Sequence, residues 1–465
     1  MTSKKPLTVW MIALINVAAI CNIKNFPVLS EYGLATLFFL LIAAIIFFIP
    51  LSLVSAELST GWPERGVYTW VREAFGPRIG FLAIWLQWIE NVIWYPTILS
   101  FIAATFAYVI NPSLASQPLY TVAVILITFW GTTCVNYFGM RISGWISSVG
   151  AFCTIVPMVL IILFSLLWIG QGNPIQIQFT WRDTLPSFTN LNDYVLLIGF
   201  LFGFAGMEMS SVHAKDVNNP KRNYPLAVLF SAILIFGLYA AGAVAIAAIV
   251  PQKDIQLASG GMDAFEQLFN AFGIPWATGL TAAVTVLGAL GMMSSWIVGP
   301  SRGLLATAQH DGDLPPILQK TNRHHMPVSI FLLQGIIVTL LSLVFLFMPS
   351  VNSSYWILLS LAAQLYLLMY ILLFLAAIRL RYSKPLVHRA YRVPGGNWGI
   401  CIASGLGVLS CTLAVIISFL PPSQIETGSH LVYQSILTGG VIFFCVVPFL
   451  IYAAKKPSWK SSRYD

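Results

Sequence analysis

Long apolar runs are the feature of this sequence that most limits its fold. A helix needs about 20 mostly apolar residues to cross the hydrocarbon core of a bilayer. Because lipid offers no partners to free backbone groups, we expect an all-α membrane protein with twelve transmembrane helices. The runs occupy residues 8–28, 34–57, 80–110, 119–140, 145–169, 193–212, 224–250, 276–299, 327–348, 354–378, 399–420 and 431–454.

The scarcity of charge agrees with a chain that is surrounded by lipid. Of the 465 residues, 58% are hydrophobic and 9% are charged, whereas soluble domains carry about 25% charged residues. Neither end holds a polar block as large as a soluble domain, so we expect one membrane domain over residues 1–465. No signal-peptide-like cleavage site follows the first apolar run, which we therefore expect to stay as the first span.

The distribution of basic residues predicts the orientation. Cytoplasmic connections of membrane proteins are enriched in lysine and arginine. If the N-terminus is inside, only Lys24, Arg182 and Lys253 of the 24 lysines and arginines fall outside the cytoplasmic segments. We therefore expect both termini in the cytoplasm of a bacterium, with the protein in its inner membrane. The net charge of +8 then reflects topology rather than nucleic-acid binding.

Some connections are predicted to be structured. Residues 58–79 and 262–272 mix aromatic, glycine and charged residues, which is typical of short interfacial helices on the inner and outer side, respectively. The stretch 301–326 lies on the inner side and contains a polar turn at residues 311–313.

Signatures of enzymes, metals and cofactors are missing from the sequence. No phosphate-binding GxxxxGK[ST] loop and no GxSxG nucleophile motif occurs. His324 and His325 lack nearby carboxylates, and the six cysteines lack CxxC spacing. We expect no enzyme activity, no metal site and no cofactor.

The first span is interrupted in its outer half by polar residues and a proline. It reads NVAAICNIKNFP over residues 16–27. Free amides and carbonyls at such an interruption can meet the charged ends of a substrate, which makes Cys21, Asn22, Ile23 and Lys24 candidates for substrate binding. An alternative for Lys24 is that its side chain snorkels to the outer interface.

The sixth span contains three glycines followed by a glutamate. Residues 199–208 read GFLFGFAGME, a pattern that predicts an unwound segment. The candidates for substrate binding here are Phe202, Gly203, Phe204 and Ala205, and Glu208 is a candidate for coupling or gating. The alternative is close helix packing through small residues, which by itself does not need a buried carboxylate such as Glu208.

Interruptions in spans one and six point to a transporter, because discontinuous helices at corresponding places of two halves mark transporter sites. Spans one and six would be the first helices of two inverted five-helix repeats, about 8–169 and 193–378, followed by two extra helices within about 399–454. Further polar residues at membrane depth are Glu90 in span three and Tyr366 and Tyr370 in span ten. Glu90 and Tyr366, together with Met292 in span eight, are further candidates for substrate binding. The two tyrosines either face a cavity or belong to an interfacial aromatic belt.

Several motifs resemble the amino acid–polyamine–organocation superfamily, and within it the glutamate/γ-aminobutyrate antiporters of acid-resistant bacteria. The motifs are AEL at 56–58, GVYTWV at 66–71, GPR at 76–78, NPKRNYPLA at 219–227, SWIVGPSRG at 295–303, VPGG at 393–396 and SFLPP at 418–422. The resemblance implies a leucine-transporter-like fold of five plus five inverted helices with two additional C-terminal helices. It also implies sodium-independent amino-acid exchange at a site between spans one, three, six, eight and ten.

This chain departs from the family pattern at several places. It lacks the small Gly-Ser/Ala-Gly motif at the break of span one, and it has Lys24 where the antiporters have an aromatic residue. In span eight it has Met292 where they have a glutamate, and its tail is too short for their C-terminal plug. The resemblance therefore implies the fold more strongly than exchange, and exchange more strongly than a glutamate substrate.

The function expected from these features is secondary active transport of small-molecule amino acids, most simply by antiport. Alternatives are a proton-coupled symporter or uniporter and a sensor that binds an amino acid without moving it. Tyr370 joins Lys24 and Glu208 as a coupling or gating candidate. The pattern leaves open which amino acid or amine is carried, and whether the protein is a monomer or a homodimer.

Overall fold

The computed structural model describes residues 8–63, 66–186, 191–209 and 219–460, and these residues form helices without strands. Between α3 and α4 the chain continues as a π-helical turn, Ala44–Phe48. The α-helices are α1 (Val9–Ile20), α2 (Phe26–Ser30), α3 (Thr36–Ala43), α4 (Ile49–Gly61), α5 (Val67–Phe75), α6 (Pro77–Ile110), α7 (Pro118–Tyr137), α8 (Met140–Gly170), α9 (Leu197–Gly203), α10 (Pro220–Ile249), α11 (Gly260–Ala271), α12 (Trp276–Asp311), α13 (Val328–Ser342), α14 (Val344–Phe347), α15 (Val351–Ser383), α16 (Gly396–Ile417) and α17 (His430–Ala453).

The helices agree with the predicted number of membrane spans. Within the described residues, eleven helical segments are long and apolar enough to cross a membrane. A further candidate is a bent pair, Val9–Ile20 and Ile23–Ser30, whose halves meet at 49°. Together these segments account for the twelve predicted spans of a multi-span membrane protein. Residues 210–212, at the predicted end of span six, lie outside the described part of the chain.

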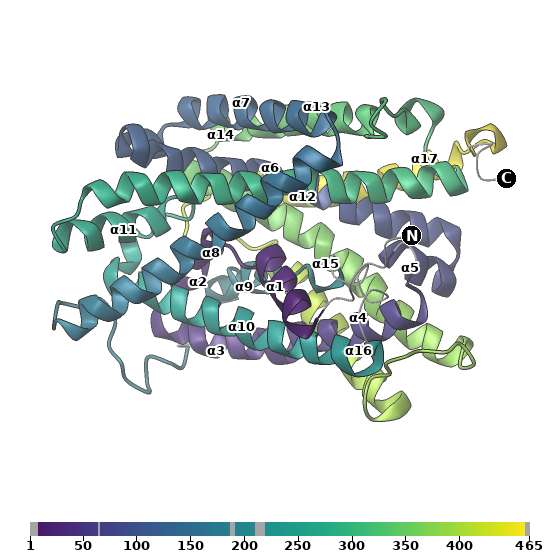
Figure 1. Ribbon diagram of the computed structural model, residues 1–465, viewed down its shortest axis with the longest axis horizontal. Helices are drawn as coiled ribbons and strands as arrows, with labels where there is room; N and C mark the ends of the chain where they lie inside the picture. The colour runs from purple at the N-terminus through teal and green to yellow at the C-terminus, as the bar shows by residue number, and fades with distance from the viewer. Residues whose placement is uncertain (1–7, 64–65, 187–190, 210–218, 461–465) are drawn as a thin grey trace.

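Two long helices form the centre of the bundle. In the most apolar stretch of α6, 83% of the residues are buried inside the protein, compared with 72% in α15 and 11% in α17. Helix α17 therefore lies at the periphery, while α6 and α15 pack against each other in the interior. Figure 1 shows most helices running along the long axis of the molecule, with α7 and α13 side by side at one edge.

Several spans continue beyond their predicted inner ends. Helix α12 reaches Asp311 rather than residue 299, and α15 reaches Ser383 rather than residue 378. Gly312 stops α12 in the left-handed conformation, with φ +71°, which favours glycine. The hydropathy pattern misses these ends because it detects where a helix leaves lipid, whereas backbone capping decides where the helix stops.

Short helices occur where the sequence predicts interfacial ones. Helix α5 falls within residues 58–79, of which 64 and 65 lie outside the described residues, and α11 matches the segment 262–272. Figure 1 places α5 and the yellow segment after α17 at one end of the molecule and α11 at the opposite end. That segment is held by Lys455, whose Nζ lies 2.7 Å from Oδ1 of Asp313.

Candidate functional site

The first span is broken between α1 and the 3₁₀ turn η1 (Ile23–Asn25). Cys21 and Asn22 adopt extended backbone conformations, and helical structure resumes at Ile23. The Asn22 side chain makes this local change favourable, because its Oδ1 accepts a hydrogen bond from the Lys24 amide at 2.9 Å. An asparagine cap replaces the helical partner that the amide loses. The predicted interruption of span one is therefore present, and it is centred on Cys21 and Asn22.

The second break follows α9. The helix ends at Gly203, and Gly206 has φ +112°, a conformation that residues with a side chain rarely adopt. The Gly206 amide donates to Oη of Tyr370 at 2.8 Å, so the backbone group freed by the break has a partner from α15. The predicted unwinding of span six is present, and residues 210–218 beyond it lie outside the described structure.

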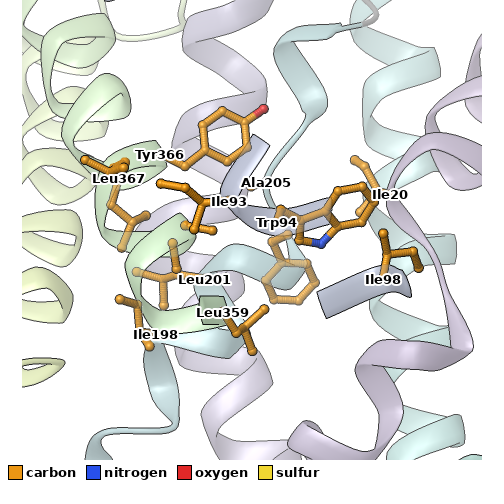
Figure 2. Packing of buried hydrophobic residues seen from close by; sticks show 14 of the residues in the cluster. Ile20, Ile93, Trp94, Ile98, Ile198, Leu201, Ala205, Leu359, Tyr366 and Leu367 are labelled. Atoms are coloured by element: carbon orange, nitrogen blue, oxygen red, sulfur yellow. The ribbon is translucent and has the colours of Figure 1, made fainter. Parts of the chain in front are cut away.

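A cavity lies between the two breaks and the helices α6, α12 and α15. It combines apolar and aromatic side chains with a few polar groups, a mixture that is typical of sites for small ligands. Figure 2 shows Ile20, Trp94, Ala205 and Tyr366 within the surrounding buried packing. The complete lining is Ala19, Ile20, Asn22, Lys24, Asn25, Glu90, Asn91, Trp94, Phe202, Gly203, Ala205, Met292, Trp296 and Tyr366.

The cavity brings together most of the residues that the sequence suggests for substrate binding. Those in the lining are Asn22, Lys24, Glu90, Phe202, Gly203, Ala205, Met292 and Tyr366. Cys21, Ile23 and Phe204 are buried next to the breaks but do not belong to the lining. The lining also includes Trp94 and Trp296, to which the pattern assigns no role. Helical spacing could have indicated both, because each lies four residues after a candidate, Glu90 or Met292.

Lys24 is buried in the lining and does not snorkel. Its side chain is only 1% exposed, so the interfacial alternative is wrong. Its Nζ lies 5.2 Å from the ring centre of Trp94 and 5.3 Å from that of Tyr355, which are cation–π distances. Among the described residues no carboxylate forms an ion pair with Lys24. The cavity therefore contains a buried basic group framed by aromatic faces.

Glu90 is the acidic group of the lining. It lies on α6 and is 2% exposed. Asn91 donates from Nδ2 to Oε1 of Glu90 at 2.5 Å. The cavity thus presents both a basic and an acidic side chain, an arrangement suited to a ligand that carries groups of both signs.

Glu208 lies behind the cavity, where two tyrosines hold it. Oη of Tyr366 donates to its Oε1 at 2.5 Å, and Oη of Tyr370 donates to its Oε2 at 2.7 Å. Both tyrosines are buried at mid-span on α15, so the interfacial-belt alternative for them is wrong. Tyr366 also lines the cavity, so it connects Glu208 to the cavity. These bonds connect the break of span six to α15.

Met292 lies where the central cavity adjoins a second hollow. Asn22 approaches the Met292 sulfur with its Nδ2 at 3.1 Å, which joins α12 to the first break. The second hollow, about 910 Å³, lies between α1, α8 and α12, and it shares Ala19, Met292 and Trp296 with the central cavity.

The described residues contain no cluster of three or more His, Cys, Asp or Glu side chains that could hold a metal ion.

Comparison with known proteins gives consistent matches over almost the whole chain. The profile of the amino acid permease family matches residues 7–442. A Legionella pneumophila protein named as an uncharacterized transporter is 44% identical over 98% of this chain and 97% of its own length. A glutamate/γ-aminobutyrate antiporter of Lactococcus lactis is 34% identical over 97% and 91%, respectively. A probable agmatine/putrescine antiporter of the same species is 25% identical over 92% and 90%.

Proposed function

Because this chain belongs to the amino acid permease family, we propose that it is a sodium-independent amino-acid antiporter of the bacterial inner membrane. The names of the 34% identical relatives support exchange of one amino acid for another or for an amine derived from it. The observation that carries the proposal is the cavity at the two helix breaks, which holds Lys24 and Glu90 in the interior of the bundle.

The first break is suited to the substrate's carboxylate. The amide of Ile23 donates to no acceptor among the described residues. Free amides at the start of a helical segment attract anions. We assign the amino group of the substrate to the second break, near the backbone of residues 202–205. Recognition of these shared groups by backbone leaves the side chains around the cavity to distinguish substrates.

Lys24 would distinguish substrates by their side chains. A buried cation without a carboxylate partner favours a ligand that brings a carboxylate or a carboxamide oxygen. The same cation repels a second positive charge, as in agmatine or putrescine. The charge of Lys24 therefore supports substrates like those in the name of the glutamate/γ-aminobutyrate antiporters. It argues against the amines in the name of the agmatine/putrescine antiporter.

Coupling would depend on the contact of Glu208 with Tyr366 and Tyr370. The carboxylate joins span six to α15, and Tyr366 carries the contact into the cavity. A substrate that touches Tyr366 can therefore influence how the two spans are held together. The second hollow next to Met292 offers the route by which a released substrate would reach the inner side. In this scheme the site is exposed to each side in turn, as alternating access requires.

Counterflow into proteoliposomes tests the proposal against its alternatives. Liposomes containing the purified protein are loaded with unlabelled L-glutamate or γ-aminobutyrate, and uptake of the labelled compound is followed. Antiport predicts uptake only into loaded vesicles, independent of sodium and of an imposed proton gradient. Uptake into empty vesicles that follows a proton gradient would indicate a symporter. Thermal stabilisation by a ligand without any transport would indicate a sensor.

A further inference from the structure

The two helix breaks are joined by one tyrosine that the sequence pattern does not single out. Tyr239 lies on α10, is buried, and does not belong to the cavity lining. Its Oη lies 2.8 Å from the carbonyl oxygen of Ile20 and 3.0 Å from that of Gly203. Ile20 is the last residue before the first break, and Gly203 is the last residue before the second. One hydroxyl therefore contacts the carbonyl that ends each helix.

The carbonyl of Ile20 needs a partner because the first break removes its helical one. In a continuous helix the carbonyl of Ile20 would accept from the amide of Lys24, but that amide donates to Oδ1 of Asn22. A buried carbonyl without a partner is costly. Tyr239 supplies the missing donor to Ile20, and its hydroxyl also contacts the carbonyl of Gly203 at the second break.

The phenol is held in place from several directions. Asn25, which lines the cavity, donates from Nδ2 to Oη of Tyr239 at 2.8 Å. The ring makes an edge contact with Phe26 just after the first break and a tilted contact with Phe204 at the second. Because the Asn25 amide occupies a lone pair, the single hydroxyl proton is directed to the two carbonyls and is shared between them. If either carbonyl moves, the hydrogen bond between the Tyr239 hydroxyl and the other carbonyl changes.

We propose that Tyr239 is a positioning residue that holds the two breaks in register, so that the backbone groups of both breaks face a substrate together. The proposal rests on the antiport function proposed above for its effect on transport, but not for its effect on the breaks. Without the hydroxyl, either break can relax independently, and part of the binding free energy is used to align the breaks again. Substrate affinity falls, whereas the rate of exchange at saturation changes little.

Tyr239→Phe tests this, because it removes the hydroxyl and keeps the ring contacts with Phe26 and Phe204. The first measurement is hydrogen–deuterium exchange of peptides that cover residues 21–25 and 204–206. Loss of one buried hydrogen bond corresponds to a change of about tenfold in opening. We expect faster exchange by this order at both breaks. Faster exchange at only one break, or at neither, would overturn the link between them.

The second measurement is counterflow with L-glutamate and γ-aminobutyrate as probes. We expect KM to rise about tenfold and the maximal rate to change less than twofold, as a loss of alignment in the bound state predicts. A fall of the maximal rate at unchanged KM would contradict the positioning role. If the parent protein exchanges neither probe, the proposed function fails, while the deuterium exchange still decides about Tyr239.

Tyr433→Phe is the matched control. Tyr433 is also buried, and its hydroxyl donates to the carbonyl of Ser418 at 3.1 Å, far along the chain from both breaks. This variant should leave KM and the deuterium exchange of both break peptides unchanged. An equal effect would show that the loss of any buried tyrosine hydroxyl suffices, which would overturn the proposal.

Should Tyr239→Phe not fold, Asn25→Ala removes the donor that orients the hydroxyl and should raise deuterium exchange at both breaks. An unchanged second break in that variant would also count against the link.

Discussion

The hydroxyl of Tyr366 donates to Oε1 of Glu208 at 2.5 Å, and it does so from the wall of the central cavity. Glu208 itself belongs to the segment that follows the break of span six, and its second oxygen accepts from Tyr370. The Glu208 carboxylate does not line the cavity, but this bond connects it to Tyr366, which does. In the proposed transport scheme, substrate binding and the arrangement of two spans would therefore share one hydrogen bond.

Glu208→Gln tests the importance of this bond. The amide keeps the volume but weakens two charge-assisted hydrogen bonds, which are about twice as strong as neutral ones. We expect exchange in counterflow to fall about tenfold or more, because both bonds that join span six to α15 lose a charged acceptor. Tyr370→Phe removes one of these two bonds and also the partner of the Gly206 amide, so it should lower exchange as well. Parent-like rates in Glu208→Gln would exclude a coupling role.

Lys24→Met tests selectivity, because methionine has a similar length and no charge. We expect the affinity for L-glutamate, measured by thermal stabilisation, to fall at least tenfold because a charge-assisted contact is lost. Neutral amino acids should bind as before. Lys24→Arg retains the cation and should keep the preference for acidic ligands. Thermal shift assays with a panel of amino acids and amines measure both effects. An unchanged ligand range in Lys24→Met would show that this lysine does not face the substrate.

Gly203 permits a graded test of the cavity. A Cβ at this position would lie 3.7 Å from the Tyr239 ring and 3.9 Å from Nδ2 of Asn25, which are ordinary contacts. Gly203→Ala should therefore fold and bind ligand. Gly203→Leu adds carbons that must enter the space of the ligand, so binding should be lost while the folded protein remains monodisperse. If Gly203→Leu exchanges substrate as well as Gly203→Ala does, the site lies elsewhere.

The predicted orientation can be tested with reporter fusions. The distribution of basic residues predicts that both termini lie in the cytoplasm. A reporter fused after residue 110, at the end of α6, should lie outside, and one fused after residue 140, beyond α7, should lie inside. Alkaline phosphatase and green fluorescent protein fusions give opposite signals on the two sides and thus control for expression. The reverse pattern would invert the assignment of inner and outer ends.

Glu31 should make stability depend on pH. It lies between the first two spans, and burial raises the pKa of its carboxyl to about 8. The ordinary value is about 4.3, so the folded state binds the proton more tightly than the unfolded state. The resulting stabilisation is complete below about pH 4 and is lost as the pH rises through about 8.

Glu31→Gln removes this titration. We expect the Tm of the parent in detergent to fall relative to that of Glu31→Gln between pH 5 and pH 9, by several degrees at the alkaline end. The exposed Glu426 offers a control, since Glu426→Gln should follow the parent curve. Parallel curves of Tm against pH for the parent and Glu31→Gln would mean that the Glu31 carboxyl is exposed to water in the folded protein.

The sequence was sufficient to identify the spans and the two interrupted ones. Hydropathy over about 20 residues is a local property, and so is the effect of Asn22 or of a glycine such as Gly206 on helical backbone. These signals act between residues that are neighbours along the chain. The candidates near the breaks and on α6, α12 and α15 followed from these signals and from the family resemblance.

Only the tertiary structure decided how those residues are used. Whether Lys24 reaches the interface or the cavity depends on helices far away in sequence, namely those that carry Trp94 and Tyr355. Tyr239 is one aromatic residue among many in an apolar span, and its role depends on the carbonyls of Ile20 and Gly203, which lie 219 and 36 residues away. In lipid, most apolar spans are chemically alike, so hydropathy cannot report which face meets which neighbour. Helix packing sets those distances, and a hydrogen bond forms only where packing brings donor and acceptor within about 3 Å.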